Sequence, residues 1–243
     1  MTDAEFQKVF NSQFEEALAF FRQKLDIPTR EWTDLWNAEH AKGFMSAGAY
    51  HADLLADLRA ITEKAIAGGM DIREFRKQFR PLVAKYGWQL KGGGPAWRSD
   101  LIWRTNRATA FAAGRWQQME VAGIEYLRYV HADGVRHPRP KHLAMNGTTL
   151  PRTDAFWGVN YPPQGFRCHC RAVPVTNAEY AATPKGQKQR PEGWRNAPDP
   201  GWGYNAGKDG MKNTREVLKD KLESWPPDIA ARVRDQMQQQ GIE

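Results

Sequence analysis

The sequence predicts an α+β fold: a mainly helical N-terminal part, then a small β-rich Cys/His module, then a partly disordered C-terminal extension. Apolar residues recur at helical spacing through about the first 120 residues. After Gly123 strand-forming residues become frequent, and four of the six histidines and both cysteines lie within His131–Cys170. Beyond Thr176 proline, glycine, lysine and asparagine dominate, a composition that is typical of a chain without a core of its own.

The first two helices are predicted from aromatic residues. The first carries an apolar stripe at a spacing of three to four residues, formed by Phe6, Phe10, Phe14, Leu18, Phe21 and Leu25. Pro28 and Thr29 interrupt the pattern, and Trp32, Leu35 and Trp36 then open a second helix. Both apolar faces are expected to pack in a core.

Three further helices are expected before Gly123. One covers Ala52–Ala67 and stops at the glycine pair that follows it. Asp71 is the expected N-cap of the next, and Pro81 should kink or end that helix. A glycine-rich break then precedes a long helix from about Ala96 to Ala122.

The remainder is expected to hold two strands and a connector. Glu125–His131 and Phe166–Val175 have strand composition, and in a strand Cys168 and Cys170 point to one face. Thr183–Gly210 is predicted to be an extended or disordered connector. Three aromatic residues of this connector could anchor on a partner or pack back on the chain: Trp194, Trp202 and Tyr204. Short amphipathic helices close the chain.

The charge of the chain is uneven. Its net charge is +7, and Lys91–Pro200 contains sixteen Lys and Arg residues against eight Asp and Glu residues. A local basic excess favours nucleic acid, although a solvated face or an acidic protein partner would also account for it. No apolar run approaches the roughly 20 residues that span a bilayer, and the first residues lack the features of a secretory signal. We therefore expect a protein that remains in the cytosol in which it is made, or is carried out inside a particle.

Three arginines of the long predicted helix form one basic stripe. At 100° per residue, Arg104, Arg107 and Arg115 project within one sector of the helix surface. The stripe could contact phosphates. It could equally bind an acidic protein surface or form ion pairs within the chain.

The cysteines and histidines suggest a metal site. Cys168 and Cys170 are too close in sequence for a good disulfide, so a metal site or two free thiols remain. Two thiolates with a loop histidine, His142 for preference and His137 second, could form a zinc shell. The spacing is not that of a standard zinc finger, and buried thiols with hydrogen-bonded histidines are the simpler alternative. The wider set of polar candidates is His131, Asp133, His137, His142, Cys168, His169 and Cys170.

A nuclease site is a weaker alternative. His142, Asn146 and His169 could be arranged as a histidine–asparagine–histidine metal nuclease, which needs its last histidine on a helix after two strands. Here His169 falls in a predicted strand. No catalytic residue is assigned from the sequence.

Several short motifs in this region resemble a known family. They are Asp133-Gly134-Val135-Arg136, Arg139-Pro140-Lys141-His142, Met145-Asn146-Gly147, Asp154-Ala155-Phe156-Trp157, Pro162-Pro163-Gln164-Gly165-Phe166 and Cys168-His169-Cys170-Arg171, preceded by Arg104-Thr105-Asn106 and Gly114-Arg115. In this order they resemble the core of the phage Mu F-like head morphogenesis domain. A stretched loop at His137-Pro138 departs from the pattern. Some members have Cys-x-x-Cys where this chain has Arg139–His142, so His142 could replace a ligand thiol.

The resemblance implies a minor head protein of a tailed phage or prophage, a virion component that acts in head assembly and DNA packaging near the portal and not a metabolic enzyme. Its implied neighbours are the portal protein, capsid or scaffold proteins and DNA, without a membrane or a small-molecule substrate. Such a protein would be located in the phage head, and in the host cytoplasm during assembly. The alternative is a metal-dependent nuclease or toxin-like effector delivered with the phage genome.

The resemblance also implies a division of the chain and roles for single residues. N-terminal helices would occupy residues 1–49, the head morphogenesis domain residues 50–176, and a flexible extension with terminal helices residues 177–243. Arg136 and Arg139 join the arginine stripe as candidate contacts for nucleic acid or a protein partner. Structural roles are implied for the motif residues Asp133, Asp154, Trp157, Pro163, Gly165 and Arg171.

Overall fold

The computed structural model describes residues 14–68, 70–90, 92–132 and 134–242. The α-helices are α2 (Glu15–Arg22), α3 (Ala52–Ile66), α4 (Ile72–Lys85), α5 (Gly94–Val121), α6 (Pro140–Ala144), α7 (Phe156–Asn160), α8 (Asn177–Ala182), α9 (Ala206–Gly210), α10 (Thr214–Ser224) and α11 (Pro227–Gln239). The short 3-10 helices are η1 (Trp32–Asp34), η2 (Asn37–Ala41), η3 (Lys185–Lys188) and η4 (Trp194–Asn196). The strands are β1 (Leu25–Asp26), β2 (Gly43–Phe44), β3 (Tyr126–Val130), β4 (Thr149–Pro151) and β5 (Arg171–Val175). The predicted α+β class is confirmed.

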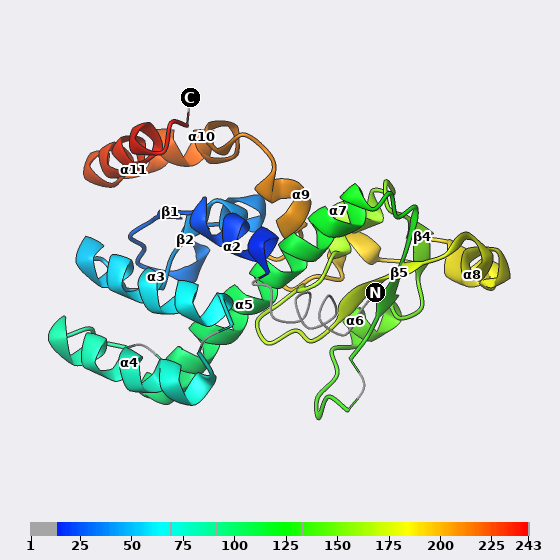
Figure 1. Ribbon diagram of the computed structural model, residues 1–243, viewed down its shortest axis with the longest axis horizontal. Helices are drawn as coiled ribbons and strands as arrows, with labels where there is room; N and C mark the ends of the chain where they lie inside the picture. Colours follow the sequence, from blue (N-terminus) through cyan, green and yellow to red (C-terminus); the bar gives the residue numbers. More distant parts are fainter. Residues whose placement is uncertain (1–13, 69, 91, 133, 243) are drawn as a thin grey trace, which may run out of the picture.

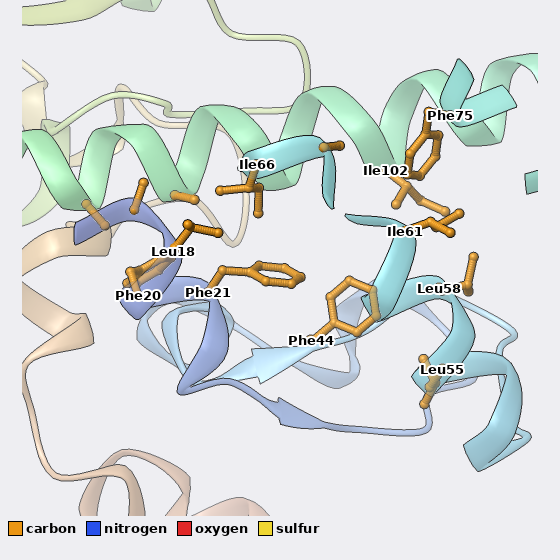
Figure 2. Packing of buried hydrophobic residues seen from close by; sticks show 14 of the residues in the cluster. Leu18, Phe20, Phe21, Phe44, Leu55, Leu58, Ile61, Ile66, Phe75 and Ile102 are labelled. Atoms are coloured by element: carbon orange, nitrogen blue, oxygen red, sulfur yellow. The ribbon is translucent and has the colours of Figure 1, made fainter. Parts of the chain in front are cut away.

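The helical part is built around α5. Helices α2, α3 and α4 all pack against it, and it runs diagonally across the molecule toward the sheet (Figure 1). Figure 2 shows the core beneath α5, where the rings of Phe21 and Phe44 meet edge to face with centroids 5.5 Å apart. Because burial of a large apolar side chain contributes about 1.5–3 kcal/mol, this layer is a main source of stability.

The three later helices of this part agree with the prediction. The Asp71 carboxylate accepts hydrogen bonds from the backbone N–H groups of Arg73 and Glu74, both at 2.8 Å, and so caps α4. Pro81 lies inside α4, which continues to Lys85. Of the two outcomes expected at Pro81, a kink or an end of the helix, the end does not occur, and the buried Phe75 and Phe79 anchor the turns that precede the proline.

The first predicted helix is too long. In the described residues α2 ends at Arg22, and Leu25 belongs to β1, where it pairs with Gly43 in a parallel arrangement. The side chains of Leu18 and Phe21 are fully buried as expected. The expected stripe also included Phe6 and Phe10, which lie outside the described residues.

The second predicted helix is also wrong. Residues 32–41 form η1 and η2 in place of one α-helix. The Asp34 carboxylate accepts from Arg30 N–H at 2.6 Å, and the Glu39 carboxylate accepts from Trp36 N–H at 2.6 Å. These local hydrogen bonds satisfy backbone N–H groups near the start of η1 and of η2. Two short 3-10 helices, separated by residues with an extended backbone, therefore replace one continuous α-helix.

The β-rich part is an antiparallel sheet of order β4-β3-β5. Leu127 and Tyr129 of β3 are fully buried on one face of the sheet, where they join the same apolar cluster as Phe156 and Trp157 of α7. The first predicted strand is confirmed. The second begins only at Arg171, which pairs with Val130.

The segment expected to be an extended or disordered connector is folded. Trp194, Trp202 and Tyr204 are 8%, 5% and 5% exposed, so they pack back on their own chain. The Asn205 side chain caps α9 and also donates to the carbonyl of Trp157 at 3.0 Å. The prediction failed because large aromatic side chains supply the burial that the aliphatic-poor composition lacks.

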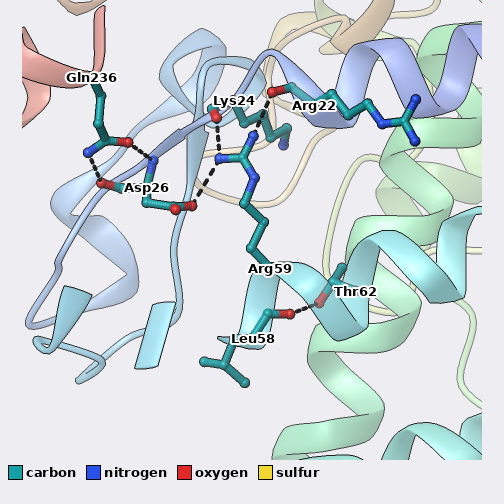
Figure 3. Close-up of polar contacts among 7 residues, drawn as sticks. All are labelled: Arg22, Lys24, Asp26, Leu58, Arg59, Thr62 and Gln236. Carbon is teal, nitrogen blue, oxygen red and sulfur yellow. Dashed lines mark hydrogen bonds and ion pairs between the residues drawn. The ribbon is translucent and has the colours of Figure 1, made fainter. Parts of the chain in front are cut away.

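The C-terminal helices return to the N-terminal strands. The Gln236 amide accepts from Asp26 N–H at 2.7 Å and donates to Asp26 O at 2.9 Å, which pairs α11 with β1 (Figure 3). Arg59 of α3 meets the Asp26 carboxylate at 3.0 Å on the other side. No helix in the described residues has the length and apolarity to cross a membrane.

Lys24 is a buried cation whose titration should be visible in the stability of the fold. Its ammonium donates to His40 O at 2.8 Å, and burial, followed by the charges of Arg59 and Lys42, lowers its pKa from 10.5 to about 7. Between these values the unfolded chain binds a proton that the folded chain lacks, so the free energy of unfolding rises with pH. The rise can reach at most roughly 1.4 kcal/mol for each pH unit of this window.

We expect Lys24→Met to flatten this rise. Urea unfolding across this pH window would measure it, with the exposed Lys219→Met as the matched control. A Lys24→Met chain whose stability climbs with pH as steeply as the control would contradict the assignment.

Candidate functional site

Both cysteines lie between a turn at residues 165–167 and the start of β5. In the turn, Arg167 adopts a left-handed backbone with φ of 57°, and Cys168 N–H donates to Gly165 O at 3.1 Å. The strand was expected to begin at Phe166, whereas its pairing begins only at Arg171. Burial still alternates before the strand, with Cys168 buried, His169 exposed and Cys170 half-buried. The two thiols therefore lie on the same side of the chain.

His142 faces these thiols from the first turns of α6. Its Nδ1 and the Sγ atoms of Cys168 and Cys170 all lie within 4.8 Å of one another, and the Cys168 Sγ to His142 Nδ1 distance is 3.7 Å. His142 is 1% exposed and Cys168 7%, whereas Cys170 is half-buried. Three of the four side chains proposed as metal ligands therefore share one site.

The other candidate polar residues lie elsewhere. His137 and His169 are exposed, and neither belongs to the cluster of thiols and imidazole among the described residues. The Asn146 side chain accepts the backbone N–H of His131 at 2.9 Å. The three residues of the possible nuclease motif thus have different environments. Asp133 lies outside the described residues.

The surroundings of the two thiols shift their pKa values in opposite directions. A hydrogen bond with the Cys168 thiol lowers the pKa of Cys170, and contacts with His142 and Tyr129 act in the same direction. The same hydrogen bond, burial and the Cys170 charge raise the pKa of Cys168. Burial and the Cys170 charge also raise the pKa of Tyr129, whose hydroxyl donates to Gln164 Oε1 at 2.5 Å.

Asp199 lies beside the ring nitrogen of His142 that faces away from the Cys168 thiol. Its carboxylate lies 3.7 Å from His142 Nε2 and 3.1 Å from Arg139 Nε. Arg139 also donates to Phe166 O at 2.7 Å. A Cβ atom on Gly165 would lie 2.1 Å from the Asp199 carboxylate, so only glycine permits this approach. Gly165 of the family motif therefore has a steric role.

Nothing in the local sequence marked Asp199 as part of this site. It stands between prolines in the segment expected to be a connector, where Asp-Pro-Gly indicates only a turn. The chain reaches the site because Asp199 N–H donates to Gln164 O at 2.9 Å. The carboxylate beside the buried histidine thus comes from a segment that is far from His142 in the sequence.

A basic cavity of about 230 Å³ lies next to Cys168. It is lined by the guanidinium groups of Arg104 and Arg107 of α5 and of Arg167 of the turn, together with the imidazole of His169. The guanidinium of Arg107 stacks 4.4 Å from the Trp103 ring centroid, and burial lowers the pKa of Arg107. Arg167 was not singled out from the sequence, because only the turn brings it to α5.

One carboxylate is shared by three guanidinium groups beside this cavity. Asp100 lies 2.9 Å from Arg104, 3.2 Å from Arg167 and 3.7 Å from Arg76. One negative charge against three positive charges leaves an excess of two. The cavity is therefore suited to an anion.

The other arginines proposed as contacts are dispersed. Arg115 and Arg136 are exposed. Arg139 is engaged with Asp199, and Arg104 with Asp100. Ion pairing within the chain, one of the alternatives considered for the stripe, thus occurs at Arg104.

Asp154 and Trp157 have structural roles at the start of α7. Asp154 accepts Phe156 N–H at 2.8 Å, and its two carboxylate oxygens accept from Nε and Nη2 of Arg190 at 2.8 and 3.0 Å. Trp157 is fully buried. Pro163 follows Pro162 through a cis peptide bond that precedes the turn at Gly165.

Comparison with known proteins identifies the family of this region. The family described as "Phage Mu protein F like protein" matches residues 56–173. The chain is 36% identical over 172 residues to the "Mu-like prophage FluMu F protein" of Haemophilus influenzae, a match that covers 66% of this chain and 41% of that protein. It is 32% identical over 181 residues to the "Putative capsid assembly protein F" of Escherichia phage Mu, covering 68% of this chain and 40% of that protein. No solved structure matches the chain.

The chain therefore spans about two fifths of the length of these relatives. The family match at residues 56–173 includes α5, α6, strands β3 and β4 and the Cys-x-Cys segment, and it ends within β5. The residues of the thiol–imidazole cluster and of the basic cavity that lie on α5 and in the turn fall inside it. Residues 56–173 of this chain thus belong to the phage Mu F-like protein family.

Proposed function

We propose that the chain is a minor head protein that acts in phage head assembly and DNA packaging near the portal. Its neighbours would be the portal protein, capsid or scaffold proteins and the packaged DNA, and its place the virion. The observation that carries the proposal is the similarity over more than 170 residues to the Mu-like prophage F protein and to the putative capsid assembly protein F of phage Mu. The chain would be made in the host cytoplasm and enter the head there.

The basic cavity supports a contact with the DNA backbone. Arg104, Arg107 and Arg167 line it together, and of these only Arg104 and Arg167 share the Asp100 carboxylate, so positive charge is left in excess at the cavity. Arginine binds phosphate oxygens in a fork geometry, and His169 adds a further donor at the rim. We therefore place the DNA contact at this cavity, and not along the whole stripe to Arg115.

Replacing both Arg104 and Arg107 with glutamate should weaken DNA binding by about tenfold or more at low salt. The slope of log K against log salt should fall by roughly two, because two phosphate contacts are lost. Fluorescence anisotropy with duplex DNA at several salt concentrations would measure both quantities. The matched control is Arg232→Glu on α11, an exposed arginine far from the cavity. Equal affinity and slope in the double variant and the control would remove the cavity from DNA binding.

The role in assembly is tested in the phage or prophage that encodes the chain. Without the protein, electron microscopy should show few DNA-filled heads, and mass spectrometry should find the protein at low copy number in complete virions. A cryo-EM map of the portal vertex should contain it. Normal yields of filled heads without the protein would contradict the proposal.

An enzymatic role has its own test. The purified chain would be incubated with DNA and RNA in the presence of divalent metals, beside His142→Ala and His169→Ala variants. Cleavage by the parent chain that either substitution abolishes would show that assembly is not its complete function.

A further inference from the structure

We propose that the thiolates of Cys168 and Cys170 and Nδ1 of His142 bind one zinc ion, and that Asp199 orients the imidazole from outside the site. This goes beyond the function proposed above and does not depend on it. The three ligands come from two segments, α6 and the turn before β5. Asp199 adds a third segment, from the C-terminal part of the chain.

The distances agree with a tetrahedral shell. Zinc lies about 2.3 Å from sulfur and about 2.0–2.1 Å from nitrogen, so in a tetrahedron a sulfur and a nitrogen ligand lie about 3.6 Å apart. The Cys168 Sγ to His142 Nδ1 distance is 3.7 Å. All three donor atoms lie within 4.8 Å of one another, so small side-chain rotations suffice for the remaining pairs.

The donor types select the metal. Two thiolates and an imidazole are soft to borderline ligands, which suit zinc and exclude the oxygen-preferring magnesium and calcium. Neither thiol is used in a disulfide. On binding, zinc displaces the thiol protons, and these protons pass to solvent.

The imidazole is oriented for ligation through Nδ1. His142 Nε2 is buried without a hydrogen bond in the described residues, and the nearest carboxylate is that of Asp199 at 3.7 Å. A histidine that binds metal through one nitrogen commonly donates its other N–H to a carboxylate. Arg139 holds that carboxylate in place at 3.1 Å. A zinc ion drawn to Nδ1 would give this N–H its partner through a small movement of Asp199.

The three side chains leave the fourth position of a tetrahedral shell to another ligand. Among the described residues, no further histidine, cysteine, aspartate or glutamate side chain joins these three ligands. Cys170 is only half-buried, so water has access on its side. A water molecule would complete the shell. The ion would then cross-link α6 to the turn before β5.

The full chain would be loaded with zinc, dialysed and measured for metal content and thermal unfolding. We expect about one zinc per chain, and a fall in Tm when a chelator removes it. The cobalt-loaded chain should show thiolate-to-cobalt charge-transfer absorption. Cys168→Ser with Cys170→Ser, and His142→Ala, should lose the metal and the chelator effect. Substitution of the exposed histidines, His137→Ala and His169→Ala, should change neither.

Asp199→Asn separates the ligand set from its support. It keeps all three ligands, so the zinc content at saturation should stay at about one, while affinity in a competition with a chelating dye should fall about 10–100-fold. Circular dichroism of each variant would establish that it is folded. The proposal is overturned if the folded parent chain retains no zinc, or if the cysteine variant retains as much as the parent. Unchanged affinity in Asp199→Asn would overturn the role of Asp199.

Discussion

Replacing Trp157 with alanine is expected to lower the free energy of unfolding by about 3–5 kcal/mol, because it leaves a large cavity in the core of the β-rich part. Trp157 is fully buried, and its ring meets that of Phe156 edge to face with centroids 4.9 Å apart. Its backbone carbonyl also accepts the amide of Asn205 at 3.0 Å. Denaturant unfolding followed by circular dichroism would give the change.

Trp36→Ala is the matched control, since it removes the same side chain from a position that is 39% exposed. It should cost less than half as much, because little cavity is created. Equal losses in the two variants would mean that Trp157 does not fill the core as described. Zinc binding should survive Trp157→Ala if the chain stays folded, because the substitution leaves all three proposed ligands in place.

Helices with strong local signals could be predicted from the sequence. For α3 and α5, apolar periodicity and flanking glycines were sufficient, and for α4 the capping side chain of Asp71 was also visible. The signals failed at residues 25–41, where carboxylates bind nearby backbone N–H groups and a two-residue parallel strand pair forms. Such pairing depends on contacts between distant residues, which periodicity does not report.

The C-terminal part was the larger failure. Its composition resembled that of a disordered segment, yet Trp194 and Trp202 are buried in two different clusters of the core. Aromatic content decides the order of this segment more than its aliphatic content does. A few tryptophans bury as much surface as many aliphatic residues, so a proline-rich segment can be ordered by docking onto a preformed surface.

For the candidate site, the types of residue were visible but the geometry was not. Cys168, Cys170 and His142 were identified by their rarity and their grouping in the sequence, and they converge. The two cysteines precede β5 and do not belong to it, because strand pairing begins only at Arg171. Asp199 and Arg167 were missed, because each reaches its site through a turn whose partner lies far away in sequence. Polar residues that support a site from a distance carry no local pattern.

The second large effect is expected at Gly207, where α9 crosses α5. A Cβ atom there would lie 2.4 Å from Cβ and 2.6 Å from Cγ of Trp116, atoms that cannot swing aside because they are next to the backbone of α5. Gly207→Ala should therefore push the two helices apart and cost about 1–3 kcal/mol, although alanine alone would favour a helix by about 1 kcal/mol. Thermal and urea unfolding would measure the loss.

Gly158→Ala is the control, because this glycine also lies in a helix and its Cβ would meet nothing within 4 Å. It should be neutral or stabilise the chain by up to about 1 kcal/mol, so the two variants should differ by roughly 1–4 kcal/mol. If Gly207→Ala is as stable as Gly158→Ala, α9 does not pack tightly on α5.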